Sequence, residues 1–199
     1  MLDHIRQDPK IAQITKVVEI KLNPAEEIDV YHNLLASIVS QQLSIKAADT
    51  IFERFLNLFP DKYPYPEEVL KFNLDDLRLV GLSRQKATYL QNVADFALNE
   101  GITWEILSPK TDQEIIDYLT KIKGVGKWTV EMILMFNLQR PDVFPVDDLG
   151  IQQAMKMLYQ LEVEGKELRA EMVKIAENWR PYRTLACRYL WKWKDTVKN

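Results

Sequence analysis

The chain has 199 residues, of which 47% are hydrophobic and 28% charged, and its formal net charge is −3. This composition is that of a globular protein, long enough for one domain or two closely packed lobes. A single cysteine (Cys187) and two histidines exclude an internal disulfide and argue against a zinc or iron–sulfur centre. Because no apolar run reaches roughly 18 residues and the first residues lack the apolar stretch of a signal peptide, we expect a cytoplasmic protein without a membrane partner.

Helical periodicity dominates the first half of the chain. Apolar residues recur at helical spacing at Leu34 and Ile38, between Ile45 and Phe55, and between Tyr89 and Ala97. This spacing predicts an all-α protein. The best strand candidate, KVVEIKL at residues 16–22, has no second strand to pair with, so we interpret it as a helix end and connector.

A glycine-rich kink separates two predicted helices in residues 111–138. A cap at Thr111 or Asp112 and an apolar stripe ending at Ile122 predict the first helix. KGVG at residues 123–126 interrupts it before a second amphipathic helix that starts near Trp128. Successive backbone N–H groups next to a helix N-terminus form an anion site. The alternative is an ordinary helical hairpin whose glycines serve only a tight turn.

The charge distribution leaves two interpretations of the C-terminal end. A net negative charge argues mildly against a nucleic-acid partner. Basic residues nevertheless gather after Trp179, where the only acid is Asp195: they are Arg180, Arg183, Arg188, Lys192, Lys194 and Lys198. This cluster is either a solvated basic end or part of a surface for an anionic partner.

The hairpin and the segment that follows it resemble those of the helix-hairpin-helix base-excision DNA glycosylases, and within them the 3-methyladenine DNA glycosylase II branch. The resemblance covers about residues 29–193 and includes VFPVDDLGI at residues 143–151. It implies an all-α fold of two helical lobes around a central cleft, with lobe one at about 30–140, lobe two at about 1–29 plus 141–199, and no N-terminal β domain. It also implies a monomer that binds damaged double-stranded DNA and holds its phosphates through the hairpin residues Lys123, Gly124, Gly126, Lys127 and Thr129.

Two adjacent aspartates compete for the catalytic role that the resemblance implies. Asp148 precedes Leu149 in the register of the family's catalytic aspartate, which favours it over Asp147. An aspartate after a proline at the start of an apolar helix is also what helix capping predicts, so one of the two is interpreted as an N-cap.

The same resemblance assigns the remaining site residues. The expected base pocket consists of Trp128, Trp191, Met132 and Leu149. The side chains expected to fill the gap left by a flipped nucleotide are Gln42 and Leu82. Their alternatives are a plain core tryptophan for Trp128, simple core for Leu82 and a helix-terminal polar residue for Gln42.

The function implied is removal of alkylated bases, of the 3-methyladenine and 7-methylguanine type, by a monofunctional glycosylase. Trp128 stands where the strand-cleaving members of the superfamily have an attacking lysine. No cofactor and no catalytic metal are expected, although a structural sodium or potassium ion on the hairpin carbonyls is compatible with the resemblance. The alternatives are a non-enzymatic DNA-binding module and a bifunctional glycosylase/lyase for oxidised bases.

Overall fold

The structure is a computed structural model that describes residues 1–20 and 29–197, and within these residues it contains helices and no strand. The first helices are α1 (Leu2–Ile5), α2 (Pro9–Val17), α3 (Val30–Ser40), α4 (Ile45–Leu56), the 3-10 turn η1 (Pro60–Lys62), α5 (Pro66–Val69), α6 (Leu74–Leu79) and α7 (Arg84–Asn99). They are followed by α8 (Trp104–Leu107), α9 (Asp112–Leu119), α10 (Lys127–Met132), the π-helical turn η2 (Ile133–Asn137), α11 (Leu149–Tyr159), α12 (Gly165–Ala176), the 3-10 turn η3 (Glu177–Trp179) and α13 (Arg183–Val197).

The all-α prediction is confirmed, and the strand candidate is a helix end as far as the structure describes it. Helix α2 ends at Val17, and Val18 is an extended C-cap whose N–H donates to the Ile14 carbonyl. Residues 21 and 22 of the KVVEIKL segment lie outside the described residues.

The chain divides into two compact units, which are described separately below. Unit 1 comprises Met1–Glu26 and Leu134–Asn199, and unit 2 comprises Glu27–Ile133. The division at Leu134 is earlier than the one expected after residue 140. Two residues of this stretch contact α13 within unit 1: the Phe136 ring lies 5.9 Å from the Trp191 ring, and the Arg140 carbonyl accepts from the Thr184 hydroxyl at 2.7 Å.

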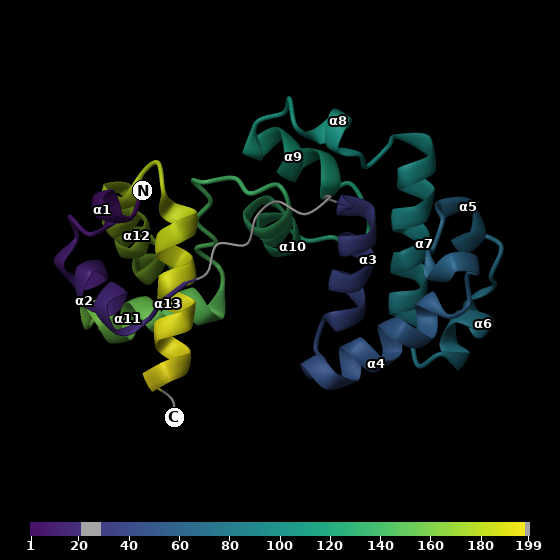
Figure 1. Ribbon diagram of the computed structural model, residues 1–199, viewed down its shortest axis with the longest axis horizontal. Helices are drawn as coiled ribbons and strands as arrows, with labels where there is room; N and C mark the ends of the chain where they lie inside the picture. The colour runs from purple at the N-terminus through teal and green to yellow at the C-terminus, as the bar shows by residue number, and fades with distance from the viewer. Residues whose placement is uncertain (21–28, 198–199) are drawn as a thin grey trace. The chain divides into compact units, whose positions relative to one another are not determined.

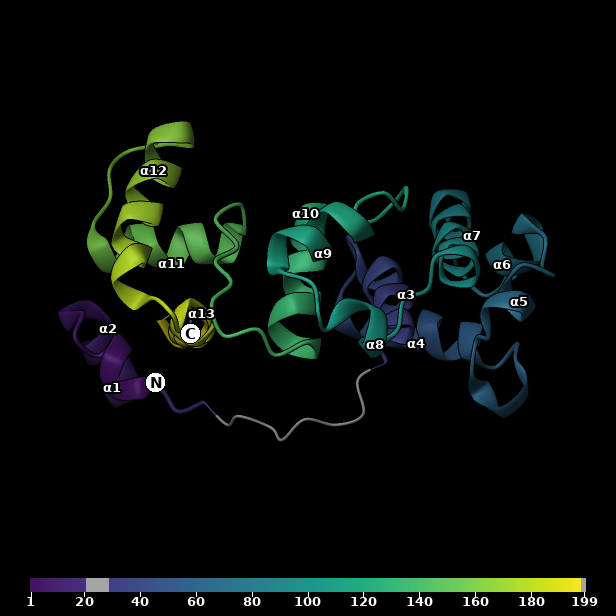
Figure 2. The same ribbon diagram turned by 90° about the horizontal axis from the view of Figure 1, so that it is seen from above.

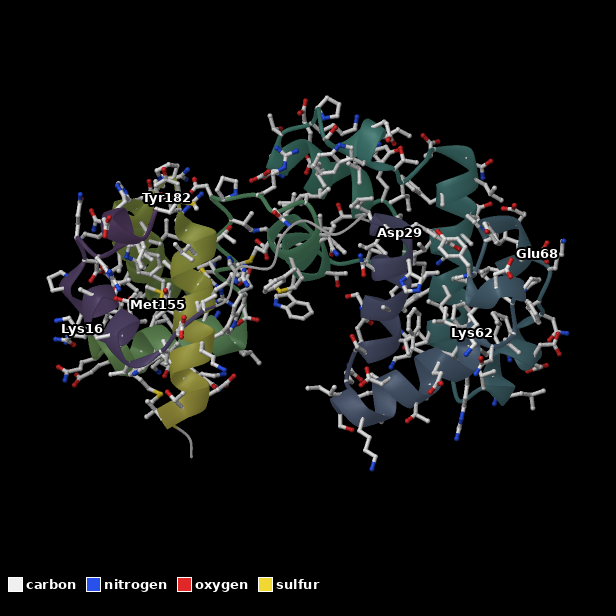
Figure 3. The ribbon with its side chains drawn as sticks, in the orientation of Figure 1. Lys16, Asp29, Lys62, Glu68, Met155 and Tyr182 are labelled. Carbon is white, nitrogen blue, oxygen red and sulfur yellow. The ribbon has the colours of Figure 1, made fainter. Side chains whose placement is uncertain are left out.

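Unit 2 is built around α7, which packs against α3, α5 and α6 (Figure 1). Ser83 caps the start of α7, and Asp29, labelled in Figure 3, caps the start of α3 by accepting from the His32 N–H. The apolar stripes of the two helices are fully buried: Leu34, Leu35 and Ile38 on α3, and Leu90, Val93 and Ala94 on α7. Helices α9 and α10 pack side by side in the same unit (Figure 2).

Unit 1 is built around α13, which packs against α11 and α2 (Figure 1). Met155, labelled in Figure 3, lies in its core. One carboxylate ties three segments together: Asp8 caps α2 and also accepts from the Tyr159 hydroxyl at 2.6 Å and from the Trp179 indole at 3.0 Å. This partly buried network ties the last residue of α11 (Leu149–Tyr159) to α2 and η3.

Candidate functional site

Asp148 lies at the start of α11 with its carboxylate held in two ways. Its Oδ1 accepts from the Ile151 backbone N–H at 2.7 Å, which makes Asp148 the N-cap of the helix. The same oxygen accepts from the Trp191 indole N–H at 2.8 Å. The residue is only 9% exposed. Asp148 is therefore the aspartate that caps the helix, and its catalytic role stays a prediction.

A glycine makes the approach of Asp148 and Trp191 sterically possible. A Cβ on Gly150 would lie 2.9 Å from Asp148 Oδ1 and 3.0 Å from both Cδ1 and Nε1 of Trp191. These distances are shorter than any ordinary van der Waals contact. Gly150 thus leaves open the space that the carboxylate and the indole share.

Asp147 differs from its neighbour in every relevant respect. Its side chain is half-exposed and forms an ion pair with Arg169 at 2.6 Å. An exposed pair of this kind contributes little stability and desolvates neither partner. Of the two aspartates, Asp148 is the one whose carboxylate is buried beside an aromatic side chain.

An aromatic pair adjoins Asp148 within unit 1. The Trp191 ring lies 5.9 Å from the Phe136 ring at an interplanar angle of 30°. The Arg188 guanidinium lies over the Phe136 ring, 5.8 Å from its centroid. Phe136 is 49% exposed and sits in the π-helical turn η2. Such turns occur often at functional sites.

Phe136 is a residue that sequence reasoning did not assign to the site. It lies four positions after Met132, the spacing of one face of the amphipathic helix predicted to start near Trp128. The π-helical turn changes that register, and no local sequence pattern predicted the change. The contact with Trp191 joins segments more than fifty positions apart, so it had to be found in the structure.

The other expected pocket residues occupy exposed or partly exposed positions. Leu149, in the first turn of α11, is 71% exposed. Trp128, in the first turn of α10 in unit 2, is 44% exposed, which argues against a plain core tryptophan. Met132 lies one turn further along α10 and is partly buried.

The two hairpin glycines serve different purposes. Thr111 begins α9 with a capping box to Glu114, as predicted, and α9 ends at Leu119. Gly124 has φ +110, and a Cβ there would lie 2.3 Å from the Tyr89 ring, so only glycine fits. Gly126 has an ordinary φ of −93 and open space around the missing Cβ.

The polar hairpin residues divide between surface and interior. Lys123 is exposed, and its carbonyl accepts from the Asn92 amide of α7 at 2.9 Å. Lys127 is exposed and lies 3.5 Å from the carboxylate of buried Glu131. Thr129, expected to contact phosphate, is buried at the foot of α10. The side chain of Thr129 is therefore not on the hairpin surface, because this position faces the unit 2 core.

The two residues expected to fill the gap left by a flipped nucleotide also separate. Gln42 is exposed in the turn between α3 and α4, with the left-handed φ of 59. Leu82 is 4% exposed and belongs to the core beneath the α6–α7 turn. The Leu82 side chain is therefore not available for insertion into DNA, because the turn directs it into the core. The exposed leucine of this segment is Leu79, at the end of α6.

The residues that the structure describes form neither a metal-binding cluster nor a membrane-spanning helix. No group of three or more His, Cys, Asp or Glu side chains in residues 1–20 and 29–197 is placed to hold a metal ion. Among the helices that the structure describes, none combines the length and apolarity needed to cross a bilayer.

Comparison with known proteins identifies the relatives of this chain. Residues 35–181 match the family described as HhH-GPD superfamily base excision DNA repair protein. DNA-3-methyladenine glycosylase 1 of Schizosaccharomyces pombe is 37% identical over 169 residues, which cover 84% of this chain and 73% of that protein. The Bacillus subtilis protein YfjP is 34% identical over 172 residues, and the match spans 59% of its length.

Solved structures extend the similarity to the fold. The Schizosaccharomyces pombe 3-methyladenine DNA glycosylase in complex with abasic DNA superposes with a TM-score of 0.81 at 35% identity, covering 93% of this chain and 91% of that one. A DNA-3-methyladenine glycosidase from Bacillus halodurans gives a TM-score of 0.82 at 35% identity, covering 98% of this chain and 88% of the other.

Proposed function

Because the chain belongs to the HhH-GPD superfamily of base excision DNA repair proteins, we propose that it is a monofunctional DNA glycosylase that removes alkylated bases such as 3-methyladenine and 7-methylguanine. The observation that carries the proposal is the Asp148 carboxylate, buried at the start of α11 and held by the Trp191 indole. A carboxylate can stabilise the positive charge that develops on the sugar, and an aromatic ring beside it can hold a cationic base.

The reaction needs little acid catalysis. An alkylated purine of this type carries positive charge, so its glycosidic bond is weakened before the enzyme acts. As the bond breaks, its electron pair leaves with the base and positive charge develops at C1′ of the sugar. Asp148 stabilises that charge and orients or deprotonates the water whose oxygen then bonds to C1′. A buried carboxylate does this better than an exposed one, because water screens it less.

Aromatic faces select the base. A cationic base attracts the π-electrons of a ring, and each such contact contributes about 0.5 to 2 kcal/mol. Trp191 and the adjoining Phe136 supply faces beside Asp148, and half-exposed Trp128 supplies one on α10. Stacking tolerates bases of several shapes, so we infer a broad range of alkylated substrates.

The DNA backbone is held by the hairpin. Exposed Gly126 leaves its surroundings open for a phosphate, and exposed Lys123 adds positive charge beside it. Rotating the damaged nucleotide out of the duplex costs a few kcal/mol. Exposed Gln42 would offset part of that cost by occupying the gap.

The proposed reaction uses water and needs no cofactor. A sodium or potassium ion on the hairpin carbonyls would be structural only, and the Lys123 carbonyl, which accepts one hydrogen bond from Asn92, keeps a lone pair for such an ion. Because the proposed substrate is DNA, we propose that the protein acts inside the cell, and the cytoplasm stays a prediction.

The test is release of free methylated base from DNA treated with a methylating agent, measured for wild type and Asp148→Asn. We expect release by wild type, loss of at least about a hundredfold in Asp148→Asn, and strand nicks only after alkali. Asp148→Asn keeps the shape of the side chain, so its fold and its affinity for DNA serve as the internal control.

Two outcomes would contradict the proposal in different ways. Salt-sensitive DNA binding without base release from any methylated substrate would leave a DNA-binding module. Nicks before alkali, together with a covalent adduct trapped by borohydride, would indicate a glycosylase/lyase, for which the exposed Lys127 next to Trp128 would be the first candidate nucleophile.

A further inference from the structure

A lysine from helix α7 holds the end of helix α3. The Lys86 ammonium donates to the backbone carbonyl of Val39 at 2.7 Å and to that of Gln41 at 2.7 Å. The two carbonyls are 47 and 45 positions away in sequence, so this is a tertiary contact between two packed helices. It lies directly before Gln42, the exposed residue at the turn.

The contact satisfies groups that a helix end leaves open. The last carbonyls of an α-helix have no partner within the helix, and a cation near that end also interacts favourably with the helix dipole. Helix α3 ends at Ser40 without a glycine cap. Lys86 takes the place of such a cap and is partly buried in doing so, and this burial lowers the pKa of its ammonium group.

The turn that Lys86 holds is conformationally demanding. Gln42 has φ 59, a left-handed conformation that costs a residue with a side chain roughly 1 kcal/mol or more. The turn is closed by one backbone bond, from the Leu43 N–H to the Ser40 carbonyl at 3.1 Å. Because the Gln41 carbonyl belongs to the peptide unit that precedes Gln42, fixing that carbonyl restricts the direction in which the Gln42 side chain leaves the turn.

Helix α7 supports the hairpin as well as this turn. Tyr89, three positions after Lys86, packs its ring on Gly124, and Asn92, three further on, donates to the Lys123 carbonyl. Successive turns of one helix therefore contact both segments of unit 2 that we place on the DNA.

We propose that Lys86 is a positioning residue that holds the α3–α4 turn so that Gln42 can fill the gap left by a flipped nucleotide. The inference rests on the proposed function, since it presumes that a nucleotide leaves the duplex. Lys86 itself touches neither the base nor the sugar. Its effect should pass entirely through Gln42.

The experiment compares binding to two duplexes of one sequence, one carrying a tetrahydrofuran abasic-site analogue and one undamaged. The affinity ratio of the two duplexes measures gap filling, whereas general backbone binding affects both duplexes alike. The variants are Lys86→Met, which keeps the length of the side chain but not the ammonium, Gln42→Ala, and the double variant. Lys174→Met, at an exposed lysine of α12, controls for removal of one positive charge.

We expect Lys86→Met and Gln42→Ala each to lower the affinity ratio about fivefold or more. The ratio of the double variant should lie within about twofold of that of either single variant, because both substitutions remove the same effect. A merely structural lysine would lower the melting temperature, weaken binding to both duplexes equally, and add its effect to that of Gln42→Ala. If Lys86→Met does not fold, Lys86→Gln retains an uncharged amide NH₂ group that can still donate, and it should give an intermediate ratio.

The inference is overturned if Lys86→Met, or in its place Lys86→Gln, keeps the wild-type ratio while Gln42→Ala lowers it. It is also overturned if Gln42→Ala has no effect, because there is then no gap filling for Lys86 to support. Base release from methylated DNA by wild type is measured separately. Failure of the proposed function would abolish base release, whereas failure of the Lys86 proposal would change only the binding ratios.

Discussion

Replacing Gly150 by alanine should reduce activity without unfolding the protein. The new Cβ would lie 2.9 Å from Asp148 Oδ1 and 3.0 Å from Trp191 Nε1, atoms that are 2.8 Å apart in their hydrogen bond. An ordinary contact needs at least 3.4 Å, so the carboxylate and the indole must each move by about half an ångström. Such a shift breaks or badly weakens the bond between them.

The magnitude follows from the type of bond. A hydrogen bond to a charged group contributes about 1.5 to 3 kcal/mol, and each 1.4 kcal/mol corresponds to about tenfold in rate. We therefore expect base release to fall about ten- to a hundredfold. Helix propensity acts in the opposite direction, since alanine within α11 is favoured over glycine by up to about 1 kcal/mol. The melting temperature should accordingly change little while activity falls.

The assay is single-turnover release of methylated base, run beside a thermal melt. The matched control is Gly165→Ala, where no atom lies within 4 Å of the new Cβ but φ is +57. That substitution should cost about 1 kcal/mol of stability and leave base release unchanged. If Gly150→Ala released base at the wild-type rate, the Asp148–Trp191 bond could not be important for the reaction.

Three further predictions test other parts of the molecule. Gly124→Ala should weaken binding to undamaged and damaged duplex alike, because both its φ of +110 and the Tyr89 ring exclude a Cβ. Fluorescence anisotropy measures this, and unchanged affinity would contradict DNA binding by the hairpin. Asp147→Asn should release base within about twofold of wild type, since its ion pair is exposed. Burial, and then the hydrogen bond to Asp8, raise the pKa of Tyr159 above its ordinary value, so the stability it contributes is complete below pH 10 and is lost as pH rises beyond it. Tyr159→Phe should lower the free energy of unfolding by about 1 kcal/mol at pH 8 and make its further fall above pH 10 smaller, as urea denaturation at several pH values will show.

Local sequence signals were sufficient for the helices and the hairpin. Apolar spacing predicted an all-α chain, and the Thr111 cap with Glu114 three residues later predicted the start of α9. These features depend on interactions between residues a few positions apart, which any reader of the sequence can evaluate. Capping predicted for the same reason that either Asp147 or Asp148 precedes this helix, and the N-cap is Asp148.

Tertiary contacts decided what those elements do. Whether Asp147 or Asp148 is buried, whether Leu82 is exposed, and that Phe136 adjoins Trp191 depend on how helices far apart in sequence pack. Patterns with a period of a few residues carry no information about such contacts.

The sequence by itself thus determined the helical class, the hairpin and the presence of a capping aspartate, Asp147 or Asp148, before α11, because short-range capping and periodicity fix each of them. Only the tertiary structure decided that the indole of Trp191 holds that aspartate and that Gly150 leaves room for the contact. The physical reason is that both facts require α13 to pack on α11, which brings together side chains 43 positions apart.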